Sequence, residues 1–469
     1  YSDEVYINSP VLTAFQFFDS ERVEVLKGPQ GTLYGRNTTG GAIKFISNKP
    51  TETFAADFRV RLAEFNSSLI EGAVSGPLSD RVRGRFAFSK NDSDGYGENL
   101  IDGSDTQGTD TLAWRGILDI DVTDTFALRA NLHGANVSSP GTSFNHLGIG
   151  PGGTDALGYA GTGDPFRGEY NRVEDIDQES IGGYLQADID IGDMRLTSVT
   201  AYDDVDHFLP EEPDASPQDL LTITYGVESQ TFTQELRLSG QTDKADWLVG
   251  AFYLTEDLKQ DQTIDLFGEL RAFTGGLSDP FGTITGAPIL FARTLNDQET
   301  ETYALFGQAS YDLTEKLTGT VGLRYTAEEK IFSAIGQLED EAAFGPAPLG
   351  IYDFQDLSLD EDSTSWRLAL DYQASENVLF YASAATGFKS GGFNGGFLDL
   401  DPAQSFIQVQ PYAPETVTSY ELGVKSDLLD NKLRLNASLF QNEFEDLQVF
   451  TLVNTSALPI QVLDNAGGA

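Results

Sequence analysis

The chain has 469 residues and a formal net charge of −44, because 73 acidic residues stand against 29 basic ones. Such a surface repels phosphates, so nucleic acid is not an expected partner. The absence of cysteine excludes disulfides and thiolate metal sites. The 48 glycines and 11% aromatic residues predict a β-rich chain with many tight turns.

The start of the chain has no basic stretch followed by an apolar run, so no signal peptide opens it. We expect an N-terminus that is processed or missing, and a cut rather than a natural end at residues 464–469. No stretch approaches ~18 consecutive apolar residues, so no transmembrane helix is expected.

A glycine-rich segment occupies residues 21–50. Val23, Val25 and Leu26 predict a short buried strand, and the glycines and proline at residues 28–31 predict a turn after it. The pair Gly40 and Gly41 precedes a second strand at residues 42–47. A phosphate-binding loop is excluded, because Gly-Lys-Ser/Thr at the correct spacing is absent.

From Phe54 onward, segments of about ten residues alternate apolar with polar positions, which is the period of a β-strand. Tight turns alternate with long loops, among them residues 207–230, 259–301 and 330–363. Short turns at one end and long loops at the other predict an outer-membrane barrel. Aromatic residues near the strand ends together fit interfacial girdles, although ordinary strand packing is the simpler explanation of each one taken alone. These residues are Trp247, Tyr311, Tyr325, Tyr381 and Tyr420.

The segment at residues 21–50 closely resembles the C-terminal part of the plug in TonB-dependent outer-membrane receptors. Residues 234–238, 247–253 and 414–423 resemble the barrel of the same family more loosely. The resemblance implies an all-β, transmembrane antiparallel β-barrel of the 22-stranded family type. About 16 strands would be present here, with a partial N-terminal plug domain in the lumen.

The resemblance also implies boundaries, a location and partners. Residues 1–50 would be the C-terminal part of the plug, and residues 51–469 the barrel without its C-terminal strands. The protein would lie in the bacterial outer membrane, in contact with lipid. The TonB energy-transducing complex would engage an N-terminal plug region, including the TonB box, that is missing from this chain.

Candidate substrate-binding residues fall in two groups. The resemblance places Tyr34, Arg36 and Asn37 at the plug apex, facing the substrate; alternatively, Arg36 pairs with barrel carboxylates in a purely structural role. Aromatic side chains of the external loops could stack on a ligand, or pack the loops against each other. These are Phe144, Tyr352, Phe354, Phe393 and Phe397.

No catalytic constellation stands out, so neither an enzyme nor a bound cofactor is expected. His133, His146 and His207 are scattered without metal-ligand spacing, and no metal site is expected from them. Residues 91–98 are similar to a calcium loop, but Lys90 occupies the first ligand position, which leaves only a loosely bound cation open. The acidic run at residues 360–362 is interpreted as a solvated loop.

The resemblance implies TonB-dependent uptake of a scarce bulky nutrient, most often a ferric siderophore. Oligosaccharide, cobalamin and haem remain alternatives by the same mechanism, as does a passive pore or structural barrel. Acidic loops would repel an anionic chelate, which favours a neutral or cationic chelate, or a neutral glycan.

Overall fold

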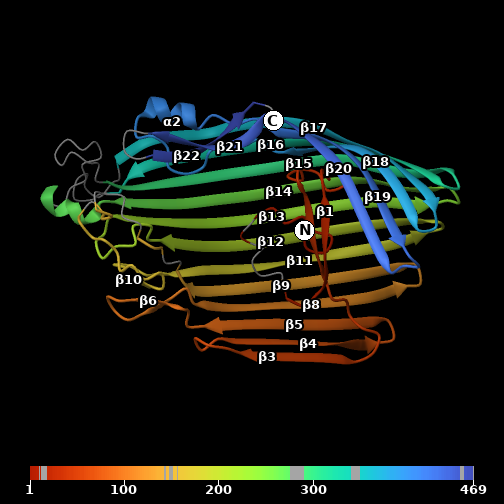
Figure 1. The fold of residues 1–469 in the computed structure, drawn as a ribbon, viewed down its shortest axis with the longest axis horizontal. Helices are drawn as coiled ribbons and strands as arrows, with labels where there is room; N and C mark the ends of the chain where they lie inside the picture. The colour runs from red at the N-terminus through yellow and green to blue at the C-terminus, as the bar shows by residue number, and fades with distance from the viewer. Residues whose placement is uncertain are drawn as a thin grey trace.

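The computed structural model describes residues 1–9, 11, 18–141, 144–146, 152–155, 157–274, 290–339, 349–454 and 459–467. Fifteen antiparallel strands form one large curved sheet, called the wall below, close to the sixteen strands expected (Figure 1). Each strand pairs with its neighbours in chain order, from β3 at one edge to β20 at the other. Within the described residues these two edges do not pair, so the wall is open.

The wall strands are β3 (Ala55–Leu62), β4 (Ser68–Ser79), β5 (Val82–Ser93), β8 (Thr109–Thr123), β9 (Phe126–Pro140), β11 (Asp175–Ile191), β12 (Met194–Glu211), β13 (Leu221–Gln241), β14 (Ala245–Leu266), β15 (Leu290–Thr314), β16 (Leu317–Leu338), β17 (Leu349–Ser375), β18 (Val378–Lys389), β19 (Glu415–Leu428) and β20 (Leu433–Glu445).

The connections alternate as the sequence predicts. Only residues 124–125 separate β8 from β9, and only residues 192–193 separate β11 from β12. The long connections, such as residues 390–414 between β18 and β19, gather at the opposite end of the wall (Figure 1). This alternation gives the wall a turn end and a loop end.

Three predicted loops were wrong in extent, because the strands continue far into them. β14 has 22 residues, β15 has 25 and β17 has 27, whereas ~9–11 are enough to cross a membrane. The predicted loop residues that are strand are 207–211, 221–230, 259–266, 290–301, 330–338 and 349–363. The polar composition of these residues led to the prediction of loops, but the strands continue through them, beyond the part of the wall that faces lipid.

The convex face of the wall carries an apolar band. Leu305 is 67% exposed and Leu323 is 57% exposed, and both alternate with buried neighbours on the other face. Tyr311, Tyr325 and Tyr420 are also exposed. Such a band matches a surface that is covered by lipid.

Tyr381 does not join the convex aromatic residues. It lies on the other face, where its hydroxyl donates to Glu421 at 2.5 Å, because it alternates with the exposed Phe380. No described helix is long and apolar enough to cross a membrane.

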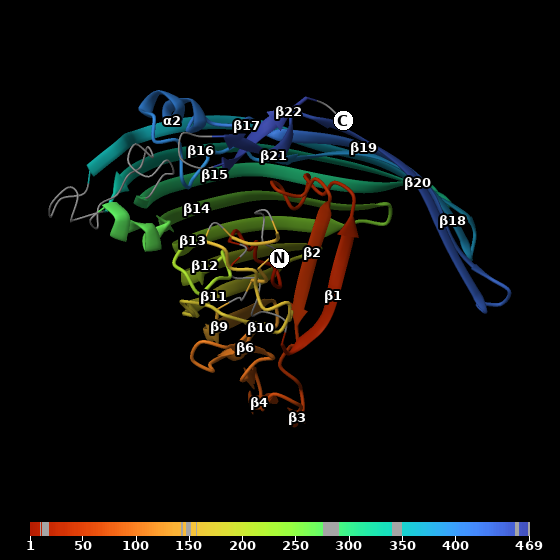
Figure 2. The same ribbon diagram turned by 60° about the vertical axis from the view of Figure 1, so that its left-hand side comes forward.

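The smaller elements lie on the concave side or at the loop end. Strands β1 (Ser20–Lys27) and β2 (Gly41–Ser47) form a two-stranded sheet that stands within the curve of the wall (Figure 2). The other short elements are β6 (Gly97–Asn99), β7 (Asp105–Thr106), β10 (Arg167–Gly168), η2 (Gly268–Thr274), α2 (Pro402–Gln408), β21 (Leu447–Asn454) and β22 (Pro459–Ala466).

The prediction that β1 is buried was wrong. Val23 is 51% exposed and Val25 is 61% exposed. The reason is that β1 pairs only with β2, so this small sheet has one face that the described residues leave uncovered.

Candidate functional site

The loop between β1 and β2, residues 28–40, is called the apex loop here. Its backbone closes on itself: the Gly28 amide donates to the Gly40 carbonyl at 3.2 Å, and the Gln30 amide donates to the Thr38 carbonyl at 3.1 Å. The Thr38 hydroxyl donates to the Gly35 carbonyl at 2.6 Å. These local bonds make the loop a compact unit that can dock on the wall as a whole.

Two glycines allow the apex loop to approach the wall. A Cβ at Gly31 would lie 2.6 Å from Ser365 Oγ and 2.8 Å from the Thr386 carbonyl oxygen. Gly35 has φ +82°, and a Cβ there would lie 2.8 Å from Arg324 Nη2. Both positions therefore require glycine, one for close approach and one for close approach together with conformation.

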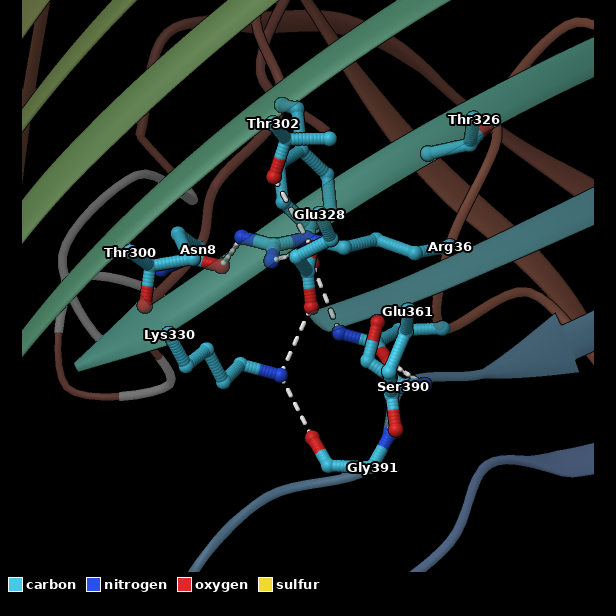
Figure 3. A network of polar contacts seen from close by, with 12 residues as sticks. Asn8, Arg36, Thr300, Thr302, Thr326, Glu328, Lys330, Glu361, Ser390 and Gly391 are labelled. Carbon is cyan, nitrogen blue, oxygen red and sulfur yellow. Dashed lines mark hydrogen bonds and ion pairs between the residues drawn. The ribbon is translucent and has the colours of Figure 1, made fainter. Parts of the chain in front are cut away.

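A buried polar network joins the apex loop to the wall (Figure 3). Arg36 Nη1 pairs with Glu328 Oε2, and Arg36 Nη2 donates to Asn8 Oδ1 at 2.8 Å. The Thr302 hydroxyl donates to Glu328 at 2.9 Å, and Lys330 Nζ lies 2.6 Å from Glu328 Oε1. The network thus places one carboxylate between two cations, one from the apex loop and one from the wall.

The network continues to the loop end of β18. Lys330 Nζ donates to the Gly391 carbonyl, and the Gly391 amide donates to Glu361 Oε2 at 3.0 Å (Figure 3). The position of the apex loop is in this way coupled to residues 390–414, one of the long connections.

Burial makes the Arg36 pair significant. The side chains of Arg36 and Glu328 are only 8% and 4% exposed. Burial lowers the pKa of Arg36, but Glu328, Tyr6 and Glu256 together outweigh it and raise that pKa above its ordinary value. Arg36 therefore stays charged, and the pair is an ion pair at low dielectric, where removal of one partner is costly.

Further contacts hold the N-terminal segment against the concave face. Asp19 pairs with Arg85 of β5, and Glu4 Oε2 lies 3.0 Å from Arg237 Nη1 of β13. Lys44 of β2 lies 2.8 Å from Glu4. Polar contacts are numerous here, and one small apolar cluster adds to them, in which the buried Val5 packs against Tyr184, Val199 and Ala201 of the wall.

The predicted apex residues lie together but differ in role. Arg36 pairs with Glu328, which is the structural alternative considered for it. The Asn37 side chain donates to the Tyr6 hydroxyl at 3.0 Å, and its backbone amide donates to the Phe388 carbonyl at 2.9 Å. Tyr34 is half-exposed and packs edge-on against Tyr1. Their contact with substrate stays a prediction.

Four of the predicted loop aromatics lie in apolar clusters. Tyr352 and Phe393 are buried, and Phe393 stacks on Phe332 with ring centroids 5.0 Å apart. Phe354 packs against the same cluster and stacks on Tyr352, whereas Phe397 packs against a neighbouring cluster around Leu266.

Phe144 lies elsewhere. It lines a separate hollow of about 300 Å³ among residues 144–168, together with His146 and Tyr159. A role of these aromatic side chains in ligand binding stays a prediction.

Sequence reasoning missed the wall half of the network. Glu328 and Lys330 sit in β16, where their alternation with apolar residues indicates strand but no partner. The acidic run at residues 360–362 was interpreted as solvated loop, and this was wrong: it is part of β17, and Glu361 turns to the concave side.

The histidines are kept apart by the fold. His133 on β9 contacts Asp203 on β12 at 3.0 Å, His146 contacts the Asp214 carbonyl, and His207 lies on β12. Among the described residues, no group of three or more His, Asp or Glu side chains is arranged to hold a metal ion.

The family follows from comparison with known sequences. A model of the family described as "TonB dependent receptor-like, beta-barrel" matches residues 200–469, and a model described as "TonB-dependent Receptor Plug Domain" matches residues 1–42. The chain belongs to the TonB-dependent receptors. It is accordingly an outer-membrane protein, and the segment before the wall is called the plug below.

Curated relatives align along nearly the whole receptor chain. The pesticin receptor of Yersinia pestis is 22% identical over 460 residues, which cover 96% of this chain and 59% of the relative. The vitamin B12 transporter BtuB of Vibrio vulnificus is 25% identical over 456 residues, covering 95% and 58%. The chain thus spans less than two thirds of the length of these relatives.

Solved structures share the fold. The ferric yersiniabactin uptake receptor FyuA from Yersinia pestis superposes with a TM-score of 0.71 at 18% identity, covering 96% of this chain and 62% of that one. The siderophore receptor PiuA from Acinetobacter baumannii gives a TM-score of 0.67 at 19% identity, covering 96% and 65%.

Proposed function

We propose that the receptor takes up a scarce bulky nutrient across the outer membrane by TonB-dependent transport, and that its cargo is a ferric siderophore. The observation that best supports transport is the position of the apex loop inside the wall, where the buried ion pair of Arg36 and Glu328 fastens it (Figure 3). A passive pore has no use for a polar plug in its path. A removable plug requires contacts that can be broken and made again.

The proposed domain boundaries are those expected from the sequence, with the plug in residues 1–50 and the barrel in residues 51–469. The proposed partners are the TonB complex, which would pull on the plug, and lipid around the convex face. Polar plug contacts suit this work, because water replaces them when they break, so their net cost is smaller than their number suggests.

The proposed cargo rests on what the relatives bind. The solved neighbours include a ferric yersiniabactin uptake receptor and a siderophore receptor. A metal-pseudopaline receptor of Pseudomonas aeruginosa, 24% identical over 457 residues, and the vitamin B12 transporter widen the range of cargo in the family. A compact metal chelate is their common chemistry. We propose that it reaches Tyr34 at the plug apex from the loop end.

The test measures binding and import of a panel of ferric chelates and neutral oligosaccharides by the full-length receptor. We expect saturable binding of at least one ferric chelate, energy-dependent import of the same chelate, and increased expression under iron limitation. Saturable sugar binding without an iron response would overturn the siderophore assignment and leave the transporter assignment intact. Import that persists without an energised inner membrane would contradict active transport.

A further inference from the structure

Two arginines on the concave face are buried without a carboxylate partner. Arg115 of β8 is 4% exposed and Arg324 of β16 is 3% exposed. In the part of the chain that the structure describes, neither guanidinium has a carboxylate oxygen within 4 Å. A buried cation that lacks a counter-ion is costly, so the wall retains both at the expense of stability.

Arg324 is held by rings rather than by charge. Its guanidinium carbon lies 5.5 Å from the ring centroid of Phe252 and 5.1 Å from that of Phe306. Its Nε donates to the Thr326 hydroxyl at 3.1 Å, which leaves the two terminal nitrogens for other contacts. This arrangement holds a guanidinium in a fixed position, ready for an oxygen ligand.

The plug covers both arginines. The backbone of Gly35 lies directly on the Arg324 guanidinium, so closely that a Cβ at Gly35 would be 2.8 Å from Arg324 Nη2. Arg115 Nη1 donates to the Phe18 carbonyl at 3.3 Å, and the guanidinium carbon of Arg115 lies 5.0 Å from the Phe18 ring centroid. Two carboxylates act electrostatically on Arg115, and both belong to the plug. They are those of Asp3 and Asp19.

Two further wall arginines take their partners from the plug. Arg85 pairs with Asp19, and Arg237 pairs with Glu4. Arg237 and Arg324 lie on one cross-strand row of the concave face, connected through Gly250 and Phe306. Near this row the wall supplies Glu235, 3.1 Å from Arg237, and Asp188 also acts electrostatically on Arg237. Withdrawal of the plug would therefore leave several guanidiniums facing the passage.

Many acidic residues that could oppose this charge face away from it. Asp257, Asp297, Glu299 and Glu329 are exposed on the convex face, where they alternate with buried residues of the concave face. The excess of negative charge that the sequence placed in the loops lies partly on the outside of the wall. On the concave side, β14 and β16 carry the buried carboxylates Glu256 and Glu328, and Glu328 is already paired with Arg36 and Lys330.

We propose that Arg85, Arg115, Arg237 and Arg324 form an anion relay that the plug covers at rest and that binds cargo during passage. The proposal rests on the proposed function, because passage requires the plug to move. It deepens that function by naming the cargo class: a chelate that presents carboxylate groups. A guanidinium binds a carboxylate with two parallel hydrogen bonds, and four such sites on one face offer a moving cargo alternative contacts.

The test measures import of iron-labelled chelates by cells that carry the full-length receptor. The panel pairs carboxylate-bearing ferric chelates with neutral ferric trihydroxamates of similar size. The variant Arg115→Gln/Arg324→Gln should lower the import rate of a carboxylate-bearing chelate by about tenfold, the loss expected for charge-assisted hydrogen bonds. Binding at the cell surface without energy should be unchanged, and import of a neutral chelate should change less than twofold, because such a chelate presents no carboxylate to these arginines.

Two controls separate this role from plug fastening. The variant Arg115→Lys/Arg324→Lys keeps the charge and should restore most of the import. The double variant Arg129→Gln/Asp119→Asn removes a pair that lies wholly within the wall, with Arg129 Nε 2.7 Å from Asp119 Oδ1, and should leave import unchanged. Receptor abundance in the outer membrane is measured for every variant.

Each outcome decides between the two proposals. Equal loss of import for charged and neutral chelates, or unchanged import of the charged one, would overturn the relay. If the wild-type receptor imported neutral chelates but no carboxylate-bearing chelate, the relay would be overturned, while the proposed siderophore uptake would still hold. Neither binding nor import of any chelate in the panel would overturn the siderophore assignment itself, together with the relay that rests on it.

Discussion

The two faces of the wall are built from the same strands and follow opposite rules. On β15 and β16 the concave face carries Thr300, Thr302 and Glu328, all buried, while the convex face carries Leu305 and Leu323, both exposed. The concave side chains have specific partners, and the convex ones form a continuous apolar surface. Alternation along a strand separates the two sets completely, because successive residues point to opposite faces.

This difference separates permanent contacts from exchangeable ones. Apolar contact with lipid has no defined partner and no cost of rearrangement, which suits a face that never changes its surroundings. Apart from the small apolar cluster around Val5, the contacts described between the plug and the wall are ion pairs and hydrogen bonds, which water can replace when they break. A plug packed by an apolar core would resist removal far more strongly, because its exposed surface would face water.

The largest effect is expected when the buried ion pair between Arg36 and Glu328 on the concave face is broken. Arg36→Gln leaves Glu328 without its plug cation, and breaking a buried pair in this way costs about 3–5 kcal/mol. We expect amide hydrogen exchange in the apex loop to accelerate about a hundredfold or more. Arg36→Gln/Glu328→Gln should recover much of the protection, since no unpaired charge is left. Equal loosening in the single and double variants would show that the pair does not fasten the plug.

A smaller effect is expected from a cation placed on each face of one strand. Ala384 lies on the convex face of β18 opposite Leu368 and Tyr420, and its neighbour Ser383 lies on the concave face opposite Glu421. Ala384→Arg should destabilise the folded barrel by about 2–4 kcal/mol, the cost of arginine near the bilayer midplane. Ser383→Arg should cost less, because Glu421 is available as a partner. Urea unfolding in lipid vesicles measures both variants, and equal costs would contradict the assignment of the two faces.

The sequence predicts the wall well because strand alternation and tight turns are local signals. The tight turns predicted at residues 121–124 and 192–193 correspond to the two-residue connections at residues 124–125 and 192–193. The glycine-rich segment likewise places the apex loop between two strands. In each case the physical cause, a backbone conformation or a two-residue period, lies within a few neighbouring positions.

The contacts of the site were harder to predict from the sequence, because they join residues that are far apart in the chain. Arg36 and Glu328 are separated by 292 positions, and nothing in the alternation around Glu328 distinguishes it from an ordinary lumen-facing residue. Loop aromatics present the same difficulty: Phe393 stacks on Phe332 of β16, a partner that no local pattern indicates. Exposure of Val23 and Val25 also depended on what covers β1, which its own sequence does not contain.

The loop end contains one buried and one half-buried carboxylate, Glu212 and Asp214, which form no salt bridge with any described residue. Glu212 is 7% exposed; one of its oxygens accepts a hydrogen bond from the Asn171 amide at 3.0 Å, while its Oε2 is buried and has no hydrogen-bond partner among the described residues. Asp214 accepts hydrogen bonds from the amides of Ser216, Leu220 and Leu221. Burial raises the pKa of Glu212 to about 8 and that of Asp214 to about 6.

The smallest expected effect is therefore a dependence of this loop, residues 212–220, on pH. Both pKa values lie above the ordinary value near ~4, so the ordered loop holds protons that an open loop would release. The resulting stability is fully present below about pH 4 and is lost as pH rises through the folded pKa values of about 6 and 8. We expect limited proteolysis within the loop to be slower at about pH 5 than at about pH 8.5. Glu212→Gln keeps the buried group neutral and should flatten most of this difference, whereas Glu174→Gln, at an exposed acid paired with Arg172, should leave it unchanged. Faster cleavage at the lower pH would contradict this prediction. It would mean that the two carboxylates are charged in the ordered loop and are stabilised there by partners, as the buried charges of the concave face are.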